Sequence, residues 1–576
     1  MTEDIYEPLP RYRDEFRAKF ADLTRDKFQQ LLERSQVDWA ANRRLNGEIQ
    51  RVRDELDSCK SKDSNFGCLL SVLIVVAVLS ASAILYGIAE ENPDHIRIAL
   101  IAGGALGIIV PLILIFQVIL PKRKLLAEKI SVLKASLQDL TRRAWEQMEP
   151  LNKLFDWNIT AELIKATVPR LEFDPYFSEN RLLDLYHSFG WNDKFNHGKS
   201  VINSHSGVIN DNPFVFGELK TMQWQEETYS GSKHIHWTTR ERGSDGKMRT
   251  VHHSQLLVAT YTAPKPFYYR EKVLLYGNDA APELHFSREP SDLSADDDGF
   301  FASLKKHSEL RKLKKLSRNL EDDLPYTLMS NHDFELLFHA TDRNDDVAFR
   351  LLFTPLAQQQ MVRLLNDRQV GCGDDFYFRK MGRINMLVSR HLNQTNLNTD
   401  PQQFRFCNVD EAREFFQRFN EEFFHSVYFA LAPLLTIPLY QQTRTTQSLY
   451  NKQTHFKSCF WEHEAIANFY GDKHFKHPDC ATENILKTSC THQSDGTSCI
   501  QVTAHGYRKK DRVAGVKVWG QDGNLHIVEV PWIEYLPVEH TSEFHVLEND
   551  SACDMKVQEK NNNLIFRRSV YAFFRN

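Results

Sequence analysis

The sequence predicts an α+β protein whose N-terminal part is helical and inserted in a membrane. Three observations support this: two uncharged apolar runs near the N-terminus, a helical apolar repeat on either side of them, and strand-like segments mixed with helices from residue 195 onward. In full, we expect an N-terminal helical coiled-coil stalk with a two-helix transmembrane hairpin, followed by cytosolic α+β and mostly-β domains. At 576 residues the chain is long enough for two or three hydrophobic cores.

The two apolar runs, residues 67–89 and 98–120, are the most distinctive segments of the chain. Neither holds a charged side chain, and each exceeds the roughly 20 residues that a helix needs to cross a bilayer. A buried core helix is the alternative, but two adjacent runs in a polar chain favour spanning. Pro111 is compatible with a bilayer helix. Gly103 and Gly107 form a small-xxx-small pair that would let two helices approach closely.

The charges that flank the runs predict their orientation. The turn at 90–97 holds one strong base, whereas the outer flanks are basic, at Arg51, Arg53, Lys60, Lys62, Lys122, Arg123 and Lys124. Since short basic loops stay on the cytoplasmic side, we expect both termini in the cytoplasm and everything after Pro121 in the cytosol. The polar N-terminus leaves the hairpin itself as the expected targeting signal.

Apolar residues recur at helical spacing on both sides of the hairpin. The steps of four and three residues are typical of coiled coils, and they run through Leu45, Ile49, Val52, Leu56 and Cys59 before it and Leu126, Ile130, Leu133, Leu137, Leu140 and Ala144 after it. We expect an antiparallel stalk that ends at Pro150. Docking of each stripe on the soluble body or on another subunit is the alternative. We also expect a homo-oligomer, held together by the coiled-coil arms and the transmembrane helices.

Beyond the stalk the pattern predicts a sheet, a mixed segment and a second sheet. Segments rich in β-branched and aromatic residues indicate antiparallel strands at 200–208, 213–222, 235–242, 254–262 and 272–276. A basic helix at 303–320, a strand at 334–338, a helix at 355–366 and strands at 375–378 and 384–389 follow. A long helix at 409–433 precedes a helix at 460–470 and strands at 499–507, 513–519, 526–530 and 544–547.

These patterns divide the chain into an N-terminal helical arm at 1–65, the transmembrane hairpin at 66–121, a second arm at 122–155, an α+β body at 156–400, a connecting long helix at 401–457 and a β-rich domain at 458–576. The charge balance, 71 basic against 76 acidic side chains, gives no reason to expect nucleic acid as a partner. The 9 scattered cysteines are odd in number and fit reduced thiols in the cytosol.

The sequence excludes several kinds of catalytic site. It holds no phosphate-binding loop, dinucleotide-binding glycine motif, nucleophile elbow or CxxC pair. His463-Glu464 opens like the HExxH zinc-protease motif, but Ala467 stands where the second histidine is needed. We expect His463 in a helix-capping or interface network. The carboxylate pairs beside Arg343 and Arg379, Asp345-Asp346 and Asp374-Asp375, are interpreted as turn and surface charge.

The densest group of metal-binding residue types lies in the C-terminal part, at His474, His477, Cys480, Cys490 and His492, with Cys499 nearby. Spacings of three residues favour two or three ligands on one metal, so zinc is the candidate cofactor and no other cofactor is expected. The spacing matches no standard zinc finger. Surface histidines and buried free thiols are the alternative interpretation.

One segment carries a family resemblance. Residues 334–369, FELLFHATDRNDDVAFRLLFTPLAQQQMVRLLNDRQ, with the following strand and the Gly382-Arg383 turn, resemble the core of the bacterial DUF3137 family. The sheet segment at 207–219 and the helix start at 350–355 are similar to the same family. SQLLVATYTAPKP, YGNDAAPELHFSR and PWIEYLPV resemble uncharacterised mollicute-type membrane proteins. The resemblance implies a DUF3137-like body and a bacterial inner-membrane location. It implies no catalytic residues, because the family has no established activity.

We therefore expect a membrane-anchored, cytosolic-facing binding or scaffold protein without catalytic activity, with the lipid bilayer and an unidentified protein as partners. The alternative is a membrane-tethered hydrolase or defence effector with a metal-dependent site around residues 463–499. A channel subunit is disfavoured, because neither apolar run carries an ionisable side chain that would mark a pathway.

Overall fold

A computed structural model describes residues 4–89, 94–192, 198–242, 247–291, 293, 300–318, 326–442, 457–494, 497–547 and 564–574. Over these residues the protein is α+β, with two antiparallel sheets and two long apolar helices. The chain forms two compact units. The first comprises Met1–Leu23, Trp157–Asp400 and Phe419–Asn576, and the second comprises Thr24–Asp156 and Pro401–Arg418.

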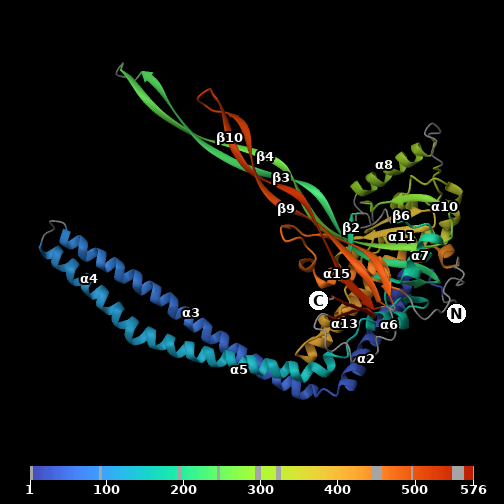
Figure 1. Ribbon diagram of the computed structural model, residues 1–576, viewed down its shortest axis with the longest axis horizontal. Coiled ribbons are helices and arrows are strands. Elements are labelled where there is room, and N and C mark those ends of the chain that lie inside the picture. The colour runs from blue at the N-terminus through green and yellow to red at the C-terminus, as the bar shows by residue number, and fades with distance from the viewer. Residues whose placement is uncertain are drawn as a thin grey trace. The chain divides into compact units, whose positions relative to one another are not determined.

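Long helices build the second unit (Figure 1). α3 (Trp39–Ala89) is continuous, and α4 (Asp94–Leu114), the π-helix η2 (Ile115–Ile119) and α5 (Leu120–Asn152) follow one another end to end. Two helices here are long and apolar enough to cross a membrane. Pro121 offers no N–H and its ring conflicts with the carbonyl four residues earlier, so a widened π-turn directly before it is the expected relief.

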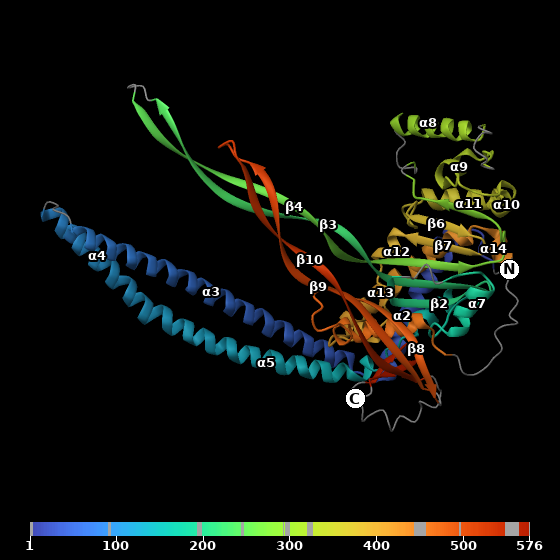
Figure 2. The ribbon, with the colours of Figure 1, turned by 45° about the horizontal axis from the view of Figure 1, so that its top comes forward.

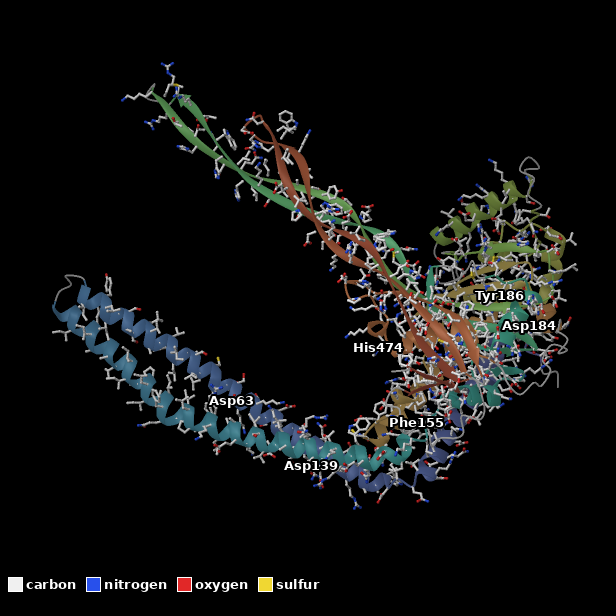
Figure 3. All side chains as sticks on the ribbon, viewed as in Figure 1. Asp63, Asp139, Phe155, Asp184, Tyr186 and His474 are labelled. Carbon is white, nitrogen blue, oxygen red and sulfur yellow. The ribbon has the colours of Figure 1, made fainter. Side chains whose placement is uncertain are left out.

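Within this unit α3 lies against both α4 and α5. The predicted stripe residues face the neighbouring helix, with Ile49 6% and Leu56 4% exposed. Two ion pairs also join the arms: Asp63 Oδ1 lies 2.9 Å from Arg123 Nε, and Glu55 Oε1 lies 2.6 Å from Lys129 Nζ. Asp63 is labelled in Figure 3. The two arms therefore pair within one chain, while a coiled-coil supercoil stays a prediction.

The close approach of α3 and α4 requires glycine. A β-carbon at Gly107 would lie 2.3 Å from Ser80 Oγ, and one at Gly104 would lie 2.4 Å from Ile84 Cγ1. At Gly103 nothing lies within 4 Å of that position. The contact is made by Gly104 and Gly107, so Gly103 of the predicted pair takes no part in it.

The first unit holds a seven-stranded antiparallel sheet in the order β1-β2-β3-β4-β7-β6-β5. Figure 2 shows β2, β3, β7 and β6 across this sheet. Asn210 and Asp211 have φ of 50° and 65° in the turn between β2 and β3, as a two-residue hairpin turn requires. The strands are β1 (Leu171–Phe173), β2 (Lys199–Ile209), β3 (Asn212–Arg242), β4 (Met248–Gly277), β5 (His285–Arg288), β6 (Phe376–Met381) and β7 (Ile384–Ser389).

A second, five-stranded sheet has the order β11-β12-β10-β9-β8. Its strands are β8 (Ile485–Ser494), β9 (Thr497–Trp519), β10 (Leu525–Leu547), β11 (Leu564–Arg567) and β12 (Val570–Phe573). α15 (Phe460–Tyr470) packs against both sheets. Trp461 and Ala465 belong to the core of the first sheet, whereas Ile466 and Ala467 belong to the core of the second. The predicted helix at 460–470 is confirmed, and it joins the two sheets.

Several predicted strands are parts of much longer ones. The segments at 213–222 and 235–242 both lie in β3, which pairs with β4 in an unbroken register from Phe214↔Tyr276 to Arg242↔Met248. At about 3.3 Å per residue this hairpin is roughly 90 Å long. The β9–β10 hairpin packs against it through a cluster of Ile235, Leu257, Ala259, Val528 and Val530. We call the two packed hairpins the β-arm. Polar residues between the apolar ones, such as those at 223–234, make the long strands look interrupted in the sequence.

Two predictions between residues 326 and 353 are wrong. Segment 334–338 belongs to a helix, α9 (His332–Phe338), because the Asn331 side chain accepts the Phe334 N–H and caps it. Arg343, interpreted as surface charge, is fully buried: it pairs with Glu335 at 3.0 Å and its guanidinium lies over Tyr326. A carboxylate and an aromatic face together compensate this buried charge.

The structure describes further helices, and among them the predicted helices at 355–366 and 409–433 are confirmed as α11 and α13. They are α1 (Pro8–Arg11), η1 (Tyr12–Phe16), α2 (Arg17–Ser35), α6 (Ile159–Thr167), α7 (Glu179–His187), α8 (Phe300–Leu316), α10 (Asp346–Leu352), α11 (Pro355–Asn366), α12 (Arg390–Gln394), η5 (Pro401–Phe404), α13 (Val409–Leu435), α14 (Pro438–Gln442) and η7 (Asp472–His474).

Candidate functional site

The predicted metal ligands of the C-terminal part lie on different elements. His474, labelled in Figure 3, ends η7 with its ring beside Phe574. His477 Nδ1 accepts the Asp479 N–H at 3.1 Å. Cys480 is buried with its Sγ 3.3 Å from Asn484 Oδ1, and Cys490 is exposed on β8. The side chain of His492 lies outside the described residues.

The only group of three or more ligand atoms found within 4.8 Å of one another, over the described part of the chain, is Cys372, Asp375 and His391. The predicted ligands His474, His477, Cys480 and Cys490 do not belong to it. Zinc at those positions stays a prediction, and the structure places a different candidate group in the first unit.

The β6–β7 hairpin brings two of these three residues together. Phe376 pairs with Ser389, so Asp375 directly before β6 and His391 just after β7 lie at the same end of the hairpin. The Arg390 N–H donates to the Asp375 carbonyl at 2.9 Å and closes that end. Cys372 comes from the loop before β6, which turns at Gly373 with φ of 67°. The sequence does carry a signal for this pair: Asp375 stands just before one predicted strand and His391 just after the next, so an antiparallel hairpin brings them together.

Both sides of the His391 imidazole meet oxygen atoms. Nδ1 lies 2.5 Å from Asp375 Oδ2, and Nε2 lies 3.1 Å from the Ser426 carbonyl on α13. Asp375 Oδ2 also accepts the His391 backbone N–H at 2.9 Å. Asp375 Oδ1 is buried and has no hydrogen-bond partner in the described structure. The carboxylate therefore keeps one oxygen unsatisfied.

The loop that carries Cys372 and Asp375 is anchored from two sides. Asp374, interpreted from the sequence as surface charge, is 1% exposed and pairs with the buried Arg288 at 2.6 Å. Arg288 Nη1 also donates to the Phe376 carbonyl at 2.6 Å. At the other end, Asp367 Oδ2 accepts the Val370 N–H at 3.1 Å. The prediction for Asp374 is wrong because a buried guanidinium on β5 compensates its charge.

A cleft of about 620 Å³ opens beside His391. Its walls include Tyr12 and Arg17 from the N-terminal helices and Glu422 and His425 from α13. His425 Nε2 lies 3.0 Å from the Val370 carbonyl, and burial lowers the pKa of this histidine. The cleft gives solutes access to the His391 side of the cluster.

Cys372 is unsuited to act as a nucleophile in this arrangement. Burial, followed by the nearby carboxylates of Asp375 and Asp367, raises the pKa of its thiol. Both ring nitrogens of His391 are also engaged with oxygen atoms, so the imidazole does not serve the thiol as a base. The arrangement fits metal ligation better than thiol catalysis.

A buried polar network around α15 holds the C-terminal hairpin in place. Glu462 forms a buried ion pair with Arg567, and Arg567 Nη2 donates to Asn203 Oδ1 at 2.6 Å. His463 Nε2 lies 2.9 Å from Ser458 Oγ, just before α15. This contact joins two side chains and no side-chain hydrogen bond caps the helix at Cys459, so the expected capping role is not shown. Glu464 pairs with Lys487 at 2.6 Å. Because its charges and His463 are partnered within the fold, this network is structural.

Comparison of the chain with known protein families, with curated proteins and with solved structures gives no match. The resemblance to the DUF3137 family and the functions expected from the sequence therefore stay predictions.

Proposed function

We propose that the protein is a membrane-anchored, cytosolic-facing binding protein that associates with further copies of itself. α3 and α4 would form the anchor, and the β-arm would supply the binding surface. The observation that carries the binding role is that the β-arm exposes apolar side chains on its outer face, although its inner face already holds a buried apolar cluster.

The anchor is supported by apolar surface that the fold leaves uncovered. None of the most apolar window of α3 is buried, and Leu79 and Leu85 are 65% and 68% exposed. Moving each such side chain from water into hydrocarbon is favourable by roughly 1.5–3 kcal/mol. The exposed apolar surface therefore favours insertion into a bilayer. The Asp63–Arg123 pair stands just outside the apolar runs, which suits the cytosolic boundary of a hairpin.

The binding surface lies on the outer face of the β9–β10 hairpin. Trp519 and Leu525 pair across the strands near its tip and are 70% and 46% exposed, and Ile527 is 54% exposed. The neighbouring inward residues, Val528 and Val530, are fully buried. Exposed apolar patches on a rigid element are typical of protein-binding sites.

The same face is complementary to itself. Lys517 pairs across the strands with Ile527, and Glu529 follows two residues later on the same side of β10. Both charged side chains are exposed. Two copies related by a two-fold axis would bring Lys517 of one against Glu529 of the other around a shared apolar centre. We therefore propose an isologous contact between copies at this face.

The molar mass of the full chain in detergent tests this contact. We expect a dimer or larger assembly for the wild type and dissociation for Ile527→Glu. Lys517→Glu should weaken the assembly, and the exchange Lys517→Glu/Glu529→Lys should restore it. Leu256→Glu on the outer face of β4 is the matched control and should leave the mass unchanged. A mass that Ile527→Glu leaves unaltered would refute self-association through this face.

Membrane anchoring is tested separately, by extraction of cell membranes with alkaline carbonate. The wild-type chain should stay in the membrane pellet. Val76→Arg, in the middle of the first run, should release part of it, since a charge at the centre of a bilayer helix costs roughly 2.5–3.5 kcal/mol. Val132→Arg, at an exposed position on α5 beyond the runs, is the control. Equal extraction of wild type and both variants would contradict the anchor.

A membrane-tethered, metal-dependent hydrolase is the second candidate. The Cys372, Asp375 and His391 group beside a cleft favours it, in place of the C-terminal residues named from the sequence. Hydrolysis of ester substrates by the zinc-loaded full chain, lost in His391→Gln, would support this candidate over the binding role.

A further inference from the structure

The three residues at the end of the β6–β7 hairpin offer a thiol, a carboxylate and an imidazole whose ligand atoms lie within 4.8 Å of one another. This combination of sulfur, oxygen and nitrogen ligands suits zinc, whereas magnesium and calcium take oxygen ligands. Backbone hydrogen bonds and the Arg288–Asp374 pair hold the hairpin end and the loop before it, so two of the three ligands stand on anchored backbone.

Hydrogen bonding selects the nitrogen of His391 that is available to a metal. The Ser426 carbonyl, 3.1 Å from Nε2, can only accept, so Nε2 donates to it. Nδ1 faces Asp375 Oδ2 at 2.5 Å, and a metal ion would take the place of a proton between these two atoms. Histidines that ligate metals usually donate their second N–H to a carbonyl or carboxylate in this way. The contact with α13 therefore orients the ring as a ligand.

Asp375 supplies the second argument. Its Oδ2 is occupied by the His391 backbone N–H, but Oδ1 is buried without a partner among the described residues. A buried carboxylate oxygen without a hydrogen bond is costly and calls for a cation or a donor. A metal ion placed between Oδ1, the His391 ring and Cys372 would satisfy it.

The spacing needs only a small adjustment. His391 Nδ1 and Asp375 Oδ2 are 2.5 Å apart. In a tetrahedral zinc site with bonds of about 2.1 Å, a nitrogen and an oxygen ligand stand roughly 3.4 Å apart. A zinc site would therefore need the two ligand atoms to separate by roughly 1 Å, or Asp375 to use Oδ1 as its ligand atom.

We propose that Cys372, Asp375 and His391 bind one zinc ion. Three protein ligands leave a fourth coordination position for water or a solute. The site is distinct from the histidines and cysteines of the C-terminal part. It stands whether or not the β-arm mediates self-association.

The metal content of the full chain, purified in detergent and loaded with equimolar zinc before desalting, tests the proposal. We expect about one zinc per chain in the wild type and little in Cys372→Ser, Asp375→Asn and His391→Gln. Cys407→Ser and His425→Gln are matched controls, a half-buried thiol elsewhere and a neighbouring histidine on the cleft, and should keep the metal. His477→Ala and Cys480→Ser should keep it too.

Cobalt loading gives a second measurement that reports the ligand type. We expect a thiolate-to-cobalt charge-transfer band in the wild type and in Cys480→Ser, and none in Cys372→Ser. Circular dichroism of each variant checks that it is folded. Should Cys372→Ser fail to fold, loss of the band in Asp375→Asn and its retention in Cys480→Ser decide in favour of the site. A wild-type chain that retains no zinc, or zinc that is lost in Cys480→Ser and kept in Cys372→Ser, would overturn the proposal.

Discussion

Replacement of Arg567 by methionine should release the C-terminal hairpin from the body. The Arg567 and Glu462 side chains are 2% and 0% exposed, so the variant removes the direct ion-pair partner of a buried carboxylate. The buried Arg568 still attracts Glu462 but forms no ion pair with it among the described residues. Two hydrogen bonds to Glu462 Oε2 then remain, from the Phe177 N–H at 3.3 Å and from Ser204 Oγ at 3.4 Å, and both are long. Breaking a buried pair in this way costs about 3–5 kcal/mol.

Hydrogen exchange of the full chain, read by mass spectrometry over β11, β12 and α15, measures this cost. Because each 1.4 kcal/mol is a factor of ten, protection in β11 and β12 should fall by roughly 10² to 10³. Arg512→Met is the control: Arg512 and Glu534 form a pair that is 45% and 31% exposed, whose loss should cost less than about 1 kcal/mol.

The double variant Arg567→Met/Glu462→Gln separates the buried charge from the lost packing. A neutral amide at position 462 has no charge to compensate, so the double variant should be more protected than Arg567→Met alone. Protection in Arg567→Met equal to that in Arg512→Met, or additive losses in the double variant, would refute the reasoning.

Three further predictions concern pH, the helical hairpin and the β-arm. Burial lowers the pKa of His463 to about 4, so the stability that neutral His463 contributes is lost as pH falls from 6.5 through 4. Burial raises the pKa of Glu464 to about 7, so the stability that protonated Glu464 contributes is lost as pH rises from 4.5 through 7. In the wild type these two pH effects offset each other. In Glu464→Gln only the His463 effect remains, so the free energy of unfolding, measured by denaturant titration, should fall by at most about 3 kcal/mol between pH 6.5 and 4. A free energy of unfolding that rises on acidification would contradict a buried, neutral His463. Gly107→Leu should collide with Ser80 and reduce cysteine cross-linking between α3 and α4, whereas Gly103→Leu should not; equal yields in both would argue against the close contact. Val528→Asp buries an unpaired charge and should make the β-arm sensitive to protease, while Ile527→Asp, one residue away and exposed, should leave the arm resistant; similar digestion of the two would show that the cluster does not hold the hairpins together.

The candidate metal group shows how far residue patterns reached. The strands at 375–378 and 384–389 were expected close to their observed positions, and their antiparallel pairing alone places Asp375 beside residue 390. Cys372 and His391 were nevertheless not singled out, because local density of histidine and cysteine pointed to residues 474–492. The pairing of strands brings these ligands together, and the local density of histidine and cysteine along the chain carries no information about that pairing.

Buried charge was the commonest source of error. Asp374 and Arg343 look like surface residues because they stand in polar, turn-like sequence. Asp374 is paired with Arg288, which is distant in sequence. Arg343 is paired with Glu335, which the short helix α9 brings close. No local pattern identifies such partners, since the pairing is made by packing.

Residue order by itself determined the elements whose period is local. Hydrophobic spacing within one segment predicts the long apolar helices, α13, α15 and the stripe by which α3 pairs with α5. This is possible because a helix forms its backbone hydrogen bonds between residues close in sequence. Only tertiary structure decided that the predicted strands join into the β-arm, that α15 lies between two cores, and that Cys372 meets His391. Strand pairing and ligand convergence depend on residues far apart in the chain, whose contacts are chosen by the packing of the whole unit.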